Sequence, residues 1–148
     1  MTSTPQQVSD RIVVGVDGSD SSLAALEWAG RQAELTGATL ELLTAWEWPT
    51  TYGAPVGVPT DFDPAADARK VLEAAEERVL TAHPGLTVHA TVVEGHPSPA
   101  LVKASKDASL LVVGSRGHGE FAGMLLGSVG EHCATNAHCP VLVLREDR

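Results

Sequence analysis

Short apolar runs alternate with longer segments of helical periodicity along most of this chain of 148 residues. Apolar residues spaced three and four apart indicate an amphipathic helix, whereas an unbroken apolar run of about four to eight residues is typical of a strand buried on both faces. The order is strand, helix, strand, helix, strand, helix, strand, helix, strand. We therefore predict an α/β fold, a doubly wound five-stranded parallel sheet with helices on both faces and right-handed crossovers.

Capping and helix-breaking residues set the expected boundaries. Ser19 or Asp20 is the candidate N-cap of the first helix, and Thr36 with Gly37 ends it. Pro64 stands at the start of the second helix, whereas several prolines and glycines leave residues 47–63 without periodicity, as expected of a functional or moving loop. The expected strands span residues 11–17, 39–46, 86–93, 108–113 and 141–144, and the later helices span residues 65–82, 97–106 and 128–136.

Composition narrows the function. The formal net charge is −9, which disfavours nucleic acid and anionic membranes because both require a basic surface. No apolar run approaches the roughly 18 residues of a membrane helix. Residues 1–10 lack the features of a signal peptide, so we expect a disordered lead-in there, one domain over residues 11–148 and a cytoplasmic location.

The two cysteines each follow a histidine, in His132-Cys133 and His138-Cys139. Two thiols do not make a disulfide framework. A metal site would require a helix end and a strand start to direct all four side chains to one point, so small buried thiols are the preferred interpretation.

Residues 113–119 (VGSRGHG) begin the most glycine-rich segment, with five glycines between Gly114 and Gly127. A strand that leads into such a loop and then into a helix is a common cradle for phosphate, which main-chain N–H groups bind. A Walker A loop is excluded because Glu120 stands where lysine is required. Residues 117–122 match a dinucleotide fingerprint, but that motif belongs at the first strand–helix turn.

Ligands of doubly wound sheets bind at the carboxyl ends of the strands, near the point where the strand order reverses. Asp17, Ala45, Gly95 and Gly114 all fall at such ends. Asp17 is a hydrogen-bond acceptor suited to hydroxyl or amino donors, or alternatively a residue that caps the first helix.

Gly114, Gly117, Gly127 and Ser128 satisfy the spacing G-x2-G-x9-G-S/T. Together with the flanking sequences VVGVDGSDSSLAALEWA, VVEGHP, LLVVGSRGHG, LLGSVGEH and CPVLVLR, this pattern resembles the ATP-binding branch of the universal stress protein family over nearly the whole chain. The resemblance implies a Rossmann-like fold of the adenine nucleotide alpha hydrolase type.

The resemblance also implies a ligand, ATP with Mg²⁺, and a set of roles. Asp17 would accept hydrogen bonds from the ribose or the adenine edge, and Ala45 would contact adenine through its backbone. The motif glycines and the start of the last helix would surround the ribose and phosphates; these residues are Gly114, Gly117, Gly127, Ser128 and Val129. Ser115 and Arg116 are further candidates for phosphate contact, although Ser115 could cap the turn and Arg116 could face solvent.

Efficient phosphoryl transfer needs a cationic clamp and a held Mg²⁺, and this segment offers only Arg116. We therefore expect a stress-response protein that binds ATP rather than an efficient enzyme. A cyclic AMP binder, a slow ATPase and a pure interaction module remain alternatives. The resemblance further implies a homodimer formed by the apolar terminal strand, Val141–Leu144, since apolar edge strands are usually paired or covered.

Overall fold

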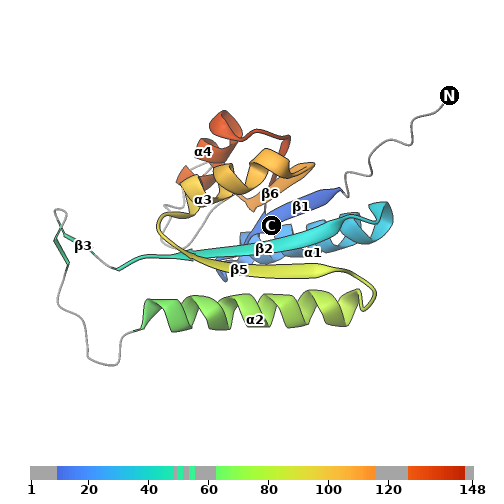
Figure 1. The fold of residues 1–148 in the computed structure, drawn as a ribbon, viewed down its shortest axis with the longest axis horizontal. Helices are drawn as coiled ribbons and strands as arrows, with labels where there is room; N and C mark the ends of the chain where they lie inside the picture. Colours follow the sequence, from blue (N-terminus) through green and yellow to red (C-terminus); the bar gives the residue numbers. More distant parts are fainter. Residues whose placement is uncertain (1–9, 49, 52–53, 56–62, 116–126, 146–148) are drawn as a thin grey trace.

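The computed structural model describes residues 10–48, 50–51, 54–55, 63–115 and 127–145. Within these residues a five-stranded sheet has the order β5-β2-β1-β6-β7 (Figure 1). All four strand pairings within this five-stranded sheet are parallel, as predicted. The strands are β1 (Arg11–Gly15), β2 (Thr39–Trp46), β5 (Val88–Glu94), β6 (Leu110–Gly114) and β7 (Val141–Leu144).

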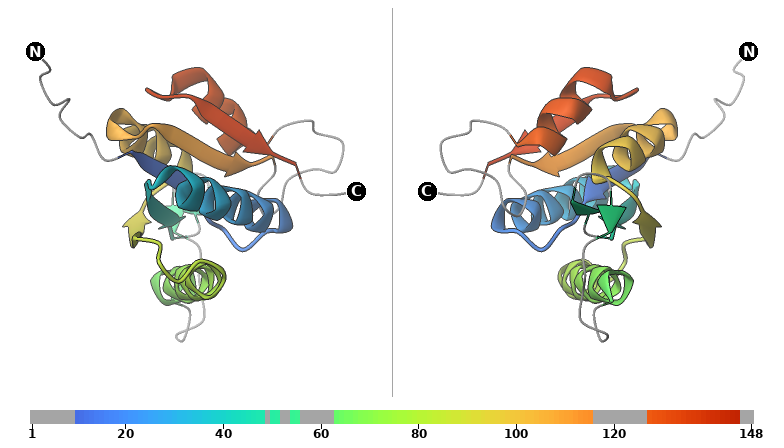
Figure 2. Two further views of the ribbon diagram at one scale, coloured as in Figure 1. Left: turned by 90° about the vertical axis from the view of Figure 1, so that its right-hand side faces the viewer. Right: turned by 90° about the vertical axis from the view of Figure 1, so that its left-hand side faces the viewer.

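In the part of the chain that the structure describes, two helices cover each face of the sheet, which confirms the doubly wound prediction (Figure 2). Helices α1 (Asp20–Thr36) and α2 (Pro64–Ala82) lie on one face, and α3 (Pro97–Ala104) and α4 (Ser128–Asn136) lie on the other. The sequence of β1 is apolar without a break because its residues are buried on both faces of the sheet. Ile12 and Val14 are buried in the layer with α1 and α2, while Val13 is buried in the layer with α3 and α4.

Ser19, Gly37 and Pro64 stand at helix ends as predicted, and Asp63 is an N-cap that the sequence analysis did not name. Ser19 is the N-cap of α1, and its side chain accepts a hydrogen bond from the Ser22 N–H at 3.2 Å. Gly37 ends that helix in the left-handed conformation, with φ of 76°, which favours glycine. Asp63 caps α2 by accepting from the Ala66 N–H at 3.0 Å, and Pro64 follows as its first residue.

Several predicted boundaries differ from the structure. β1 ends at Gly15 rather than residue 17, although the Val16 N–H still donates to the Leu43 carbonyl at 2.9 Å. Residues 47–63 contain a short antiparallel pair, β3 (Thr50–Thr51) and β4 (Ala54–Pro55), where we expected no regular element. The third and fourth predicted strands are displaced by one to two residues, and the third helix ends at Ala104 and continues as the 3-10 turn η1 (Ser105–Asp107).

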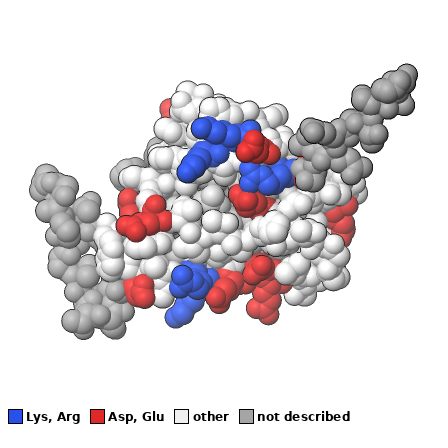
Figure 3. Space-filling model, in the orientation of Figure 1, with Lys and Arg blue, Asp and Glu red and all other residues white. Residues whose placement is uncertain are grey.

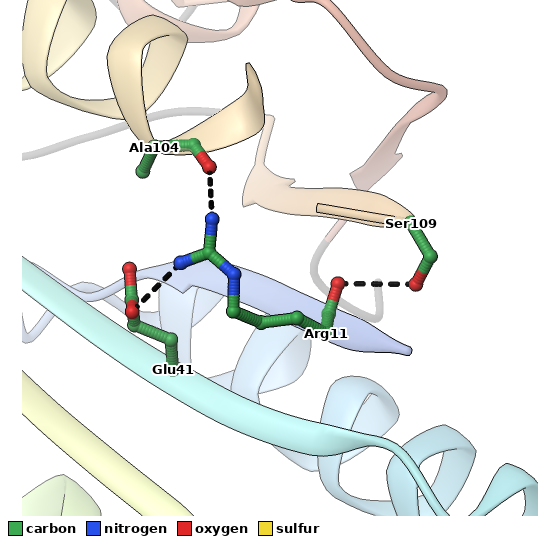
Figure 4. A network of polar contacts seen from close by, with 4 residues as sticks. All are labelled: Arg11, Glu41, Ala104 and Ser109. Atoms are coloured by element: carbon green, nitrogen blue, oxygen red, sulfur yellow. Dashed lines mark hydrogen bonds and ion pairs between the residues drawn. The ribbon is translucent and has the colours of Figure 1, made fainter. Parts of the chain in front are cut away.

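Arg11 joins four segments at the amino-terminal edge of the sheet (Figure 4). Its guanidinium donates to the Glu41 carboxylate at 2.8 Å and to the Ala104 carbonyl at 2.6 Å. Its own carbonyl accepts from the Ser109 hydroxyl at 3.0 Å. Because the ion pair is mostly shielded from water, these contacts fix β1, β2, the end of α3 and the start of β6 relative to one another. None of the described helices is long and apolar enough to cross a membrane.

Candidate functional site

A cleft lies where the strand order reverses, beside β1, whose neighbours are β2 and β6. Parallel sheets bind ligands at this position because the strand ends and the following loops diverge there. The cavity volume is about 80 Å³, smaller than the ~300 Å³ at the lower end for drug-sized ligands. A drug-sized ligand would therefore fit into this cleft only in part. It is lined by Gly15, Val16, Asp17, Ser22, Leu43, Ala45, Pro97, Leu101, Val113, Gly114, Gly127, Val129 and Gly130.

Asp17 organises the turn between β1 and α1. Its Oδ1 accepts from the Ser19 N–H at 2.9 Å and from the Ser19 hydroxyl at 2.6 Å. The Asp17 N–H in turn donates a hydrogen bond to the Ser22 hydroxyl at 3.3 Å. The helix cap is therefore Ser19, with Asp17 orienting it. The carboxylate is held at the mouth of the cleft by these two hydrogen bonds.

Gly114 lies at a close contact between α1 and the end of β6. A Cβ atom at this position would lie 2.5 Å from the Ser21 hydroxyl oxygen, 2.7 Å from the Ser21 carbonyl carbon and 2.8 Å from the Ser22 nitrogen. Such separations are too short for any real side chain, and two of them involve backbone that cannot rotate away. The first glycine of the motif is thus required by helix packing, independently of any ligand.

The N-terminus of α4 opens on the same cleft. Its N-cap is Gly127, which has no side chain to accept a hydrogen bond from the first turn. The Gly127 N–H donates to the Ser115 carbonyl at 2.5 Å, and the Ser115 N–H donates to the Leu144 carbonyl at 2.7 Å. The first bond holds the end of β6 against the start of α4, and the second holds it to the end of β7. Helix N-termini attract anions because their N–H groups and dipole both favour negative charge.

The N-terminus of α3 borders the cleft through Pro97 but is chemically different. Pro97 and Pro99 occupy its first and third positions, and proline has no backbone N–H. Its N-cap residue, His96, makes no capping hydrogen bond with its side chain. This helix end therefore supplies apolar surface rather than a row of donors.

The structure brings most of the predicted site residues together. Five of them line the cleft: Asp17, Ala45, Gly114, Gly127 and Val129. Ser115 is buried beside it in the two hydrogen bonds described above, and Ser128 is the first residue of α4. Gly95 lies in a neighbouring groove instead. Arg116 and Gly117 lie outside the described residues.

Sequence reasoning did not identify the apolar side of the cleft. Leu43 and Leu101 contribute to it from β2 and α3, and Ser22 from the first turn of α1. Ser22 carries a usable signal, because it stands in the first turn of the helix that follows β1. Leu43 and Leu101 carry none, since nothing in their local sequence separates them from other buried leucines.

The cysteines match the expectation of buried or half-buried thiols. Cys133, a residue of α4, is fully buried, and burial raises its pKa to about 11. Cys139 is half-buried, and burial also raises its pKa, partly opposed by the Arg11 charge. Among the residues that the structure describes, no three histidine, cysteine or acidic side chains are grouped closely enough to hold a metal ion.

The sequence profile described as the universal stress protein family matches residues 9–145. This chain belongs to that family. A universal stress protein of Mycobacterium tuberculosis (strain ATCC 25618 / H37Rv) is 37% identical over 145 residues, covering 92% of this chain and 48% of that protein. The chain spans about half the length of the curated relatives it matches.

Solved structures of the family share the fold. A crystal structure of a universal stress protein in complex with cAMP is 33% identical, with a TM-score of 0.70 over 93% of this chain and 98% of that one. The universal stress protein UspA from Lactobacillus plantarum superimposes with a TM-score of 0.76 at 23% identity, over 93% of this chain and 98% of that one. The five-stranded parallel sheet with helices on both faces is therefore the family's architecture.

Proposed function

We propose that this protein binds an adenine nucleotide in the cleft at the carboxyl ends of β1, β2 and β6. The observation that carries the proposal is the N-terminus of α4, which opens on the cleft behind a glycine N-cap. Phosphate oxygens would accept hydrogen bonds from the first-turn N–H groups of Val129 and Gly130. The apolar side of the cleft, formed by Leu43 and Leu101, suits the face of a base.

The family supports the ligand class. The relative that is 33% identical was crystallised in complex with cAMP, which contains adenine, ribose and phosphate. Asp17 would accept from ribose hydroxyls or from the adenine edge, and the Ala45 backbone would meet adenine. Because the enclosed volume is only about 80 Å³, most of the nucleotide would lie across the edge of the sheet.

Within this class we propose ATP as the physiological ligand, with the G-x2-G-x9-G-S/T motif around its phosphates. Gly114, Gly117, Gly127 and Ser128 form that motif, and Ser115 and Arg116 lie within it. The residues fit the nucleotide better than they fit its Mg²⁺. Among the described residues that line the cleft, only Asp17 has a carboxylate, so the ion would be held mainly by phosphate oxygens.

The proposed role is that of a nucleotide-dependent regulator in the cytoplasmic stress response, with ATP occupancy as the signal. Isothermal titration with ATP and Mg²⁺ tests the binding, and absence of heat at millimolar nucleotide would contradict it. Competition between ATP and cAMP decides the alternative that the cAMP complex of the relative favours. Mass spectrometry of any nucleotide released on denaturing the purified protein identifies the ligand directly.

A slow ATPase is the second candidate activity. Phosphate release that persists through stringent purification and falls in Gly117→Val would support it. A Gly117→Val protein that keeps the same rate would assign the release to a contaminant.

We also propose a homodimer through β7. This strand is an edge of the sheet, and its four residues are all half-buried. Pairing two copies of β7 across a two-fold axis would satisfy the free backbone groups at that edge. Charged substitutions at Val141 and Val143 are expected to give monomers by sedimentation, and a variant that stays dimeric would exclude this interface.

A further inference from the structure

The opposite edge of the sheet is longer than the β7 edge. β5 has seven residues, Val88–Glu94, against four in β7, and its only described strand neighbour is β2. His89, Ala90, Thr91 and Glu94 of this strand are exposed. Figures 1 and 2 show β5 along the outer margin of the sheet, with α2 beneath it.

The hydrogen bonds between β2 and β5 show which backbone groups of β5 remain at the free edge. The Leu40 N–H donates to the Thr87 carbonyl at 2.9 Å, and the Gly95 N–H donates to the Trp46 carbonyl at 2.6 Å. In a parallel pair, alternate residues direct both backbone groups to the same neighbour. The odd-numbered residues of β5 therefore face β2, and the outward set is Val88, Ala90, Val92 and Glu94.

Edge strands are usually protected by proline, by lysine or by inward-pointing charge. β5, with the sequence VHATVVE, has no proline or lysine, and Glu94 at its end is its only acidic or basic residue apart from His89. The other edge strand of the five-stranded sheet, β7, is shorter than β5. The proposed homodimer would cover that edge. Four alternate residues of β5 therefore have backbone groups that face away from β2 and can pair with another strand.

An open groove runs beside this edge, on the face that carries α3. Its volume is about 710 Å³. Leu43 and Val93 contribute its apolar surface from the sheet, and Ala100, Lys103 and Ala104 contribute the α3 side. In Figure 3 the surface over β2 and β5 is mostly uncharged, with charged side chains gathered above it and below it. Side chains of a strand added to β5 would reach this groove at every second position.

We propose that the β5 edge and this groove, here called the β5 docking surface, bind an extended peptide segment of another protein by strand addition. Main-chain hydrogen bonds to Ala90 and its outward neighbours would supply affinity, and the groove would select apolar side chains at alternate positions. Glu94 has no ion-pair partner among the described residues. Together with the net charge of −9, this favours a lysine or arginine at the peptide position beside Glu94.

A second copy of this chain fits the β5 docking surface less well. Two different two-fold interfaces on opposite edges of one sheet would not close, and they would generate an open-ended assembly of chains. A single extended peptide completes the edge without that consequence.

The decisive variant is Ala90→Pro. Proline at an outward residue removes an N–H that β2 does not use, whereas the fold keeps all of its own ladder bonds. The matched control is Ala90→Ser, which keeps the N–H. Selection of random nine-residue peptides displayed on phage against the wild-type chain should enrich sequences with alternating apolar residues and a lysine or arginine. A synthetic copy of an enriched peptide should bind Ala90→Pro at least tenfold more weakly than Ala90→Ser by fluorescence polarisation.

A second measurement does not depend on how well Ala90→Pro folds. Methylating alternate backbone amides of the same peptide should abolish binding in one register and leave it nearly unchanged in the other. Equal binding by Ala90→Pro and Ala90→Ser, or no effect of methylation in either register, would overturn the proposal. It would also be overturned if no alternating sequences are enriched, or if sedimentation shows that Ala90→Pro alone lowers the oligomeric state, because the edge would then be an interface between copies.

Discussion

The N-termini of α1 and α4 meet at one cleft and are built in opposite ways. In α1 the first turn is satisfied within the chain, because Ser19 accepts from the Ser22 N–H and Asp17 orients Ser19. In α4 the N-cap is Gly127, which can accept nothing through a side chain. A helix end that is capped internally contributes rigidity, whereas one that is not leaves its N–H groups for an external anion. The difference is consistent with the proposed function, in which α1 shapes the cleft and α4 would bind the charged part of the nucleotide.

The largest expected effect on stability is at Gly114, which packs against α1, and Gly127, the N-cap of α4, is its comparison. Gly114→Ala places a Cβ within 2.8 Å of α1 backbone, so we expect a loss of about 3 kcal/mol in the free energy of unfolding, typical of severe overpacking. Gly127→Ala is the control, because its φ of −71° suits any residue. It should cost less than about 1 kcal/mol. Urea denaturation measures both, and equal losses would show that α1 can move away from β6.

A proline in the first turn of α4, like those in the first turn of α3, tests directly whether this helix end binds phosphate. Val129→Pro removes one first-turn N–H at a position where a helix tolerates proline. Hydrogen bonds to charged groups contribute about 1.5 to 3 kcal/mol, so the affinity for ATP should fall at least tenfold by calorimetry. Val129→Ala keeps the N–H and should bind nearly as the wild type does. If both variants bind equally, the phosphates lie elsewhere.

The packing of α4 against the sheet is expected to depend on pH, because this helix contains Cys133. Burial raises the pKa of the Cys133 thiol from 9.0 to about 11, so the folded state holds this proton more tightly than the unfolded state. The contribution is complete below pH 9 and is lost as the pH rises to 11. In a Cys139→Ala background, the free energy of unfolding should fall by roughly 1 to 3 kcal/mol more over this interval with Cys133 present than in Cys133→Ala. Parallel curves would mean that the thiol is accessible to water.

The smallest expected effect concerns the α1 cap. Ser19→Ala removes the acceptor of the Ser22 N–H and should lower the free energy of unfolding by about 1 kcal/mol. Ser19→Thr keeps both the acceptor for the Ser22 N–H and the hydroxyl that donates to Asp17, and it should recover most of the loss. If α1 only shapes the cleft, ATP affinity changes less than twofold in either variant, and a larger change would give α1 a direct part in binding.

The fold was predictable where local sequence determines the element. β2, α4 and β7 have the expected bounds because glycine, proline or a change of periodicity stands at each end. The starts of β5 and β6 were less accurate, since neighbouring strands decide where pairing begins. The pair β3–β4 was missed because a two-residue strand has no periodicity.

The sequence predicted which residues at the strand ends belong to the site. It did not predict the packing contacts that shape the cleft around them. Asp17, Ala45 and Gly114 meet at one cleft because parallel strands end at the same edge. The reason for Gly114 could not be read from the sequence, because the contact with Ser21 joins residues 93 positions apart and depends on how closely α1 packs. The contribution of Leu101 likewise depends on the position of α3.

The hydrogen bond between the Gly127 N–H and the Ser115 carbonyl has a consequence for how this chain can diverge. This bond fixes the end of β6 and the start of α4 next to each other. Closing a loop of twice the length costs only about 0.6 kcal/mol more. A change in the number of residues that join Ser115 to Gly127 therefore costs little free energy, so related chains could acquire new ligand preferences here while β6 and α4 stay unchanged.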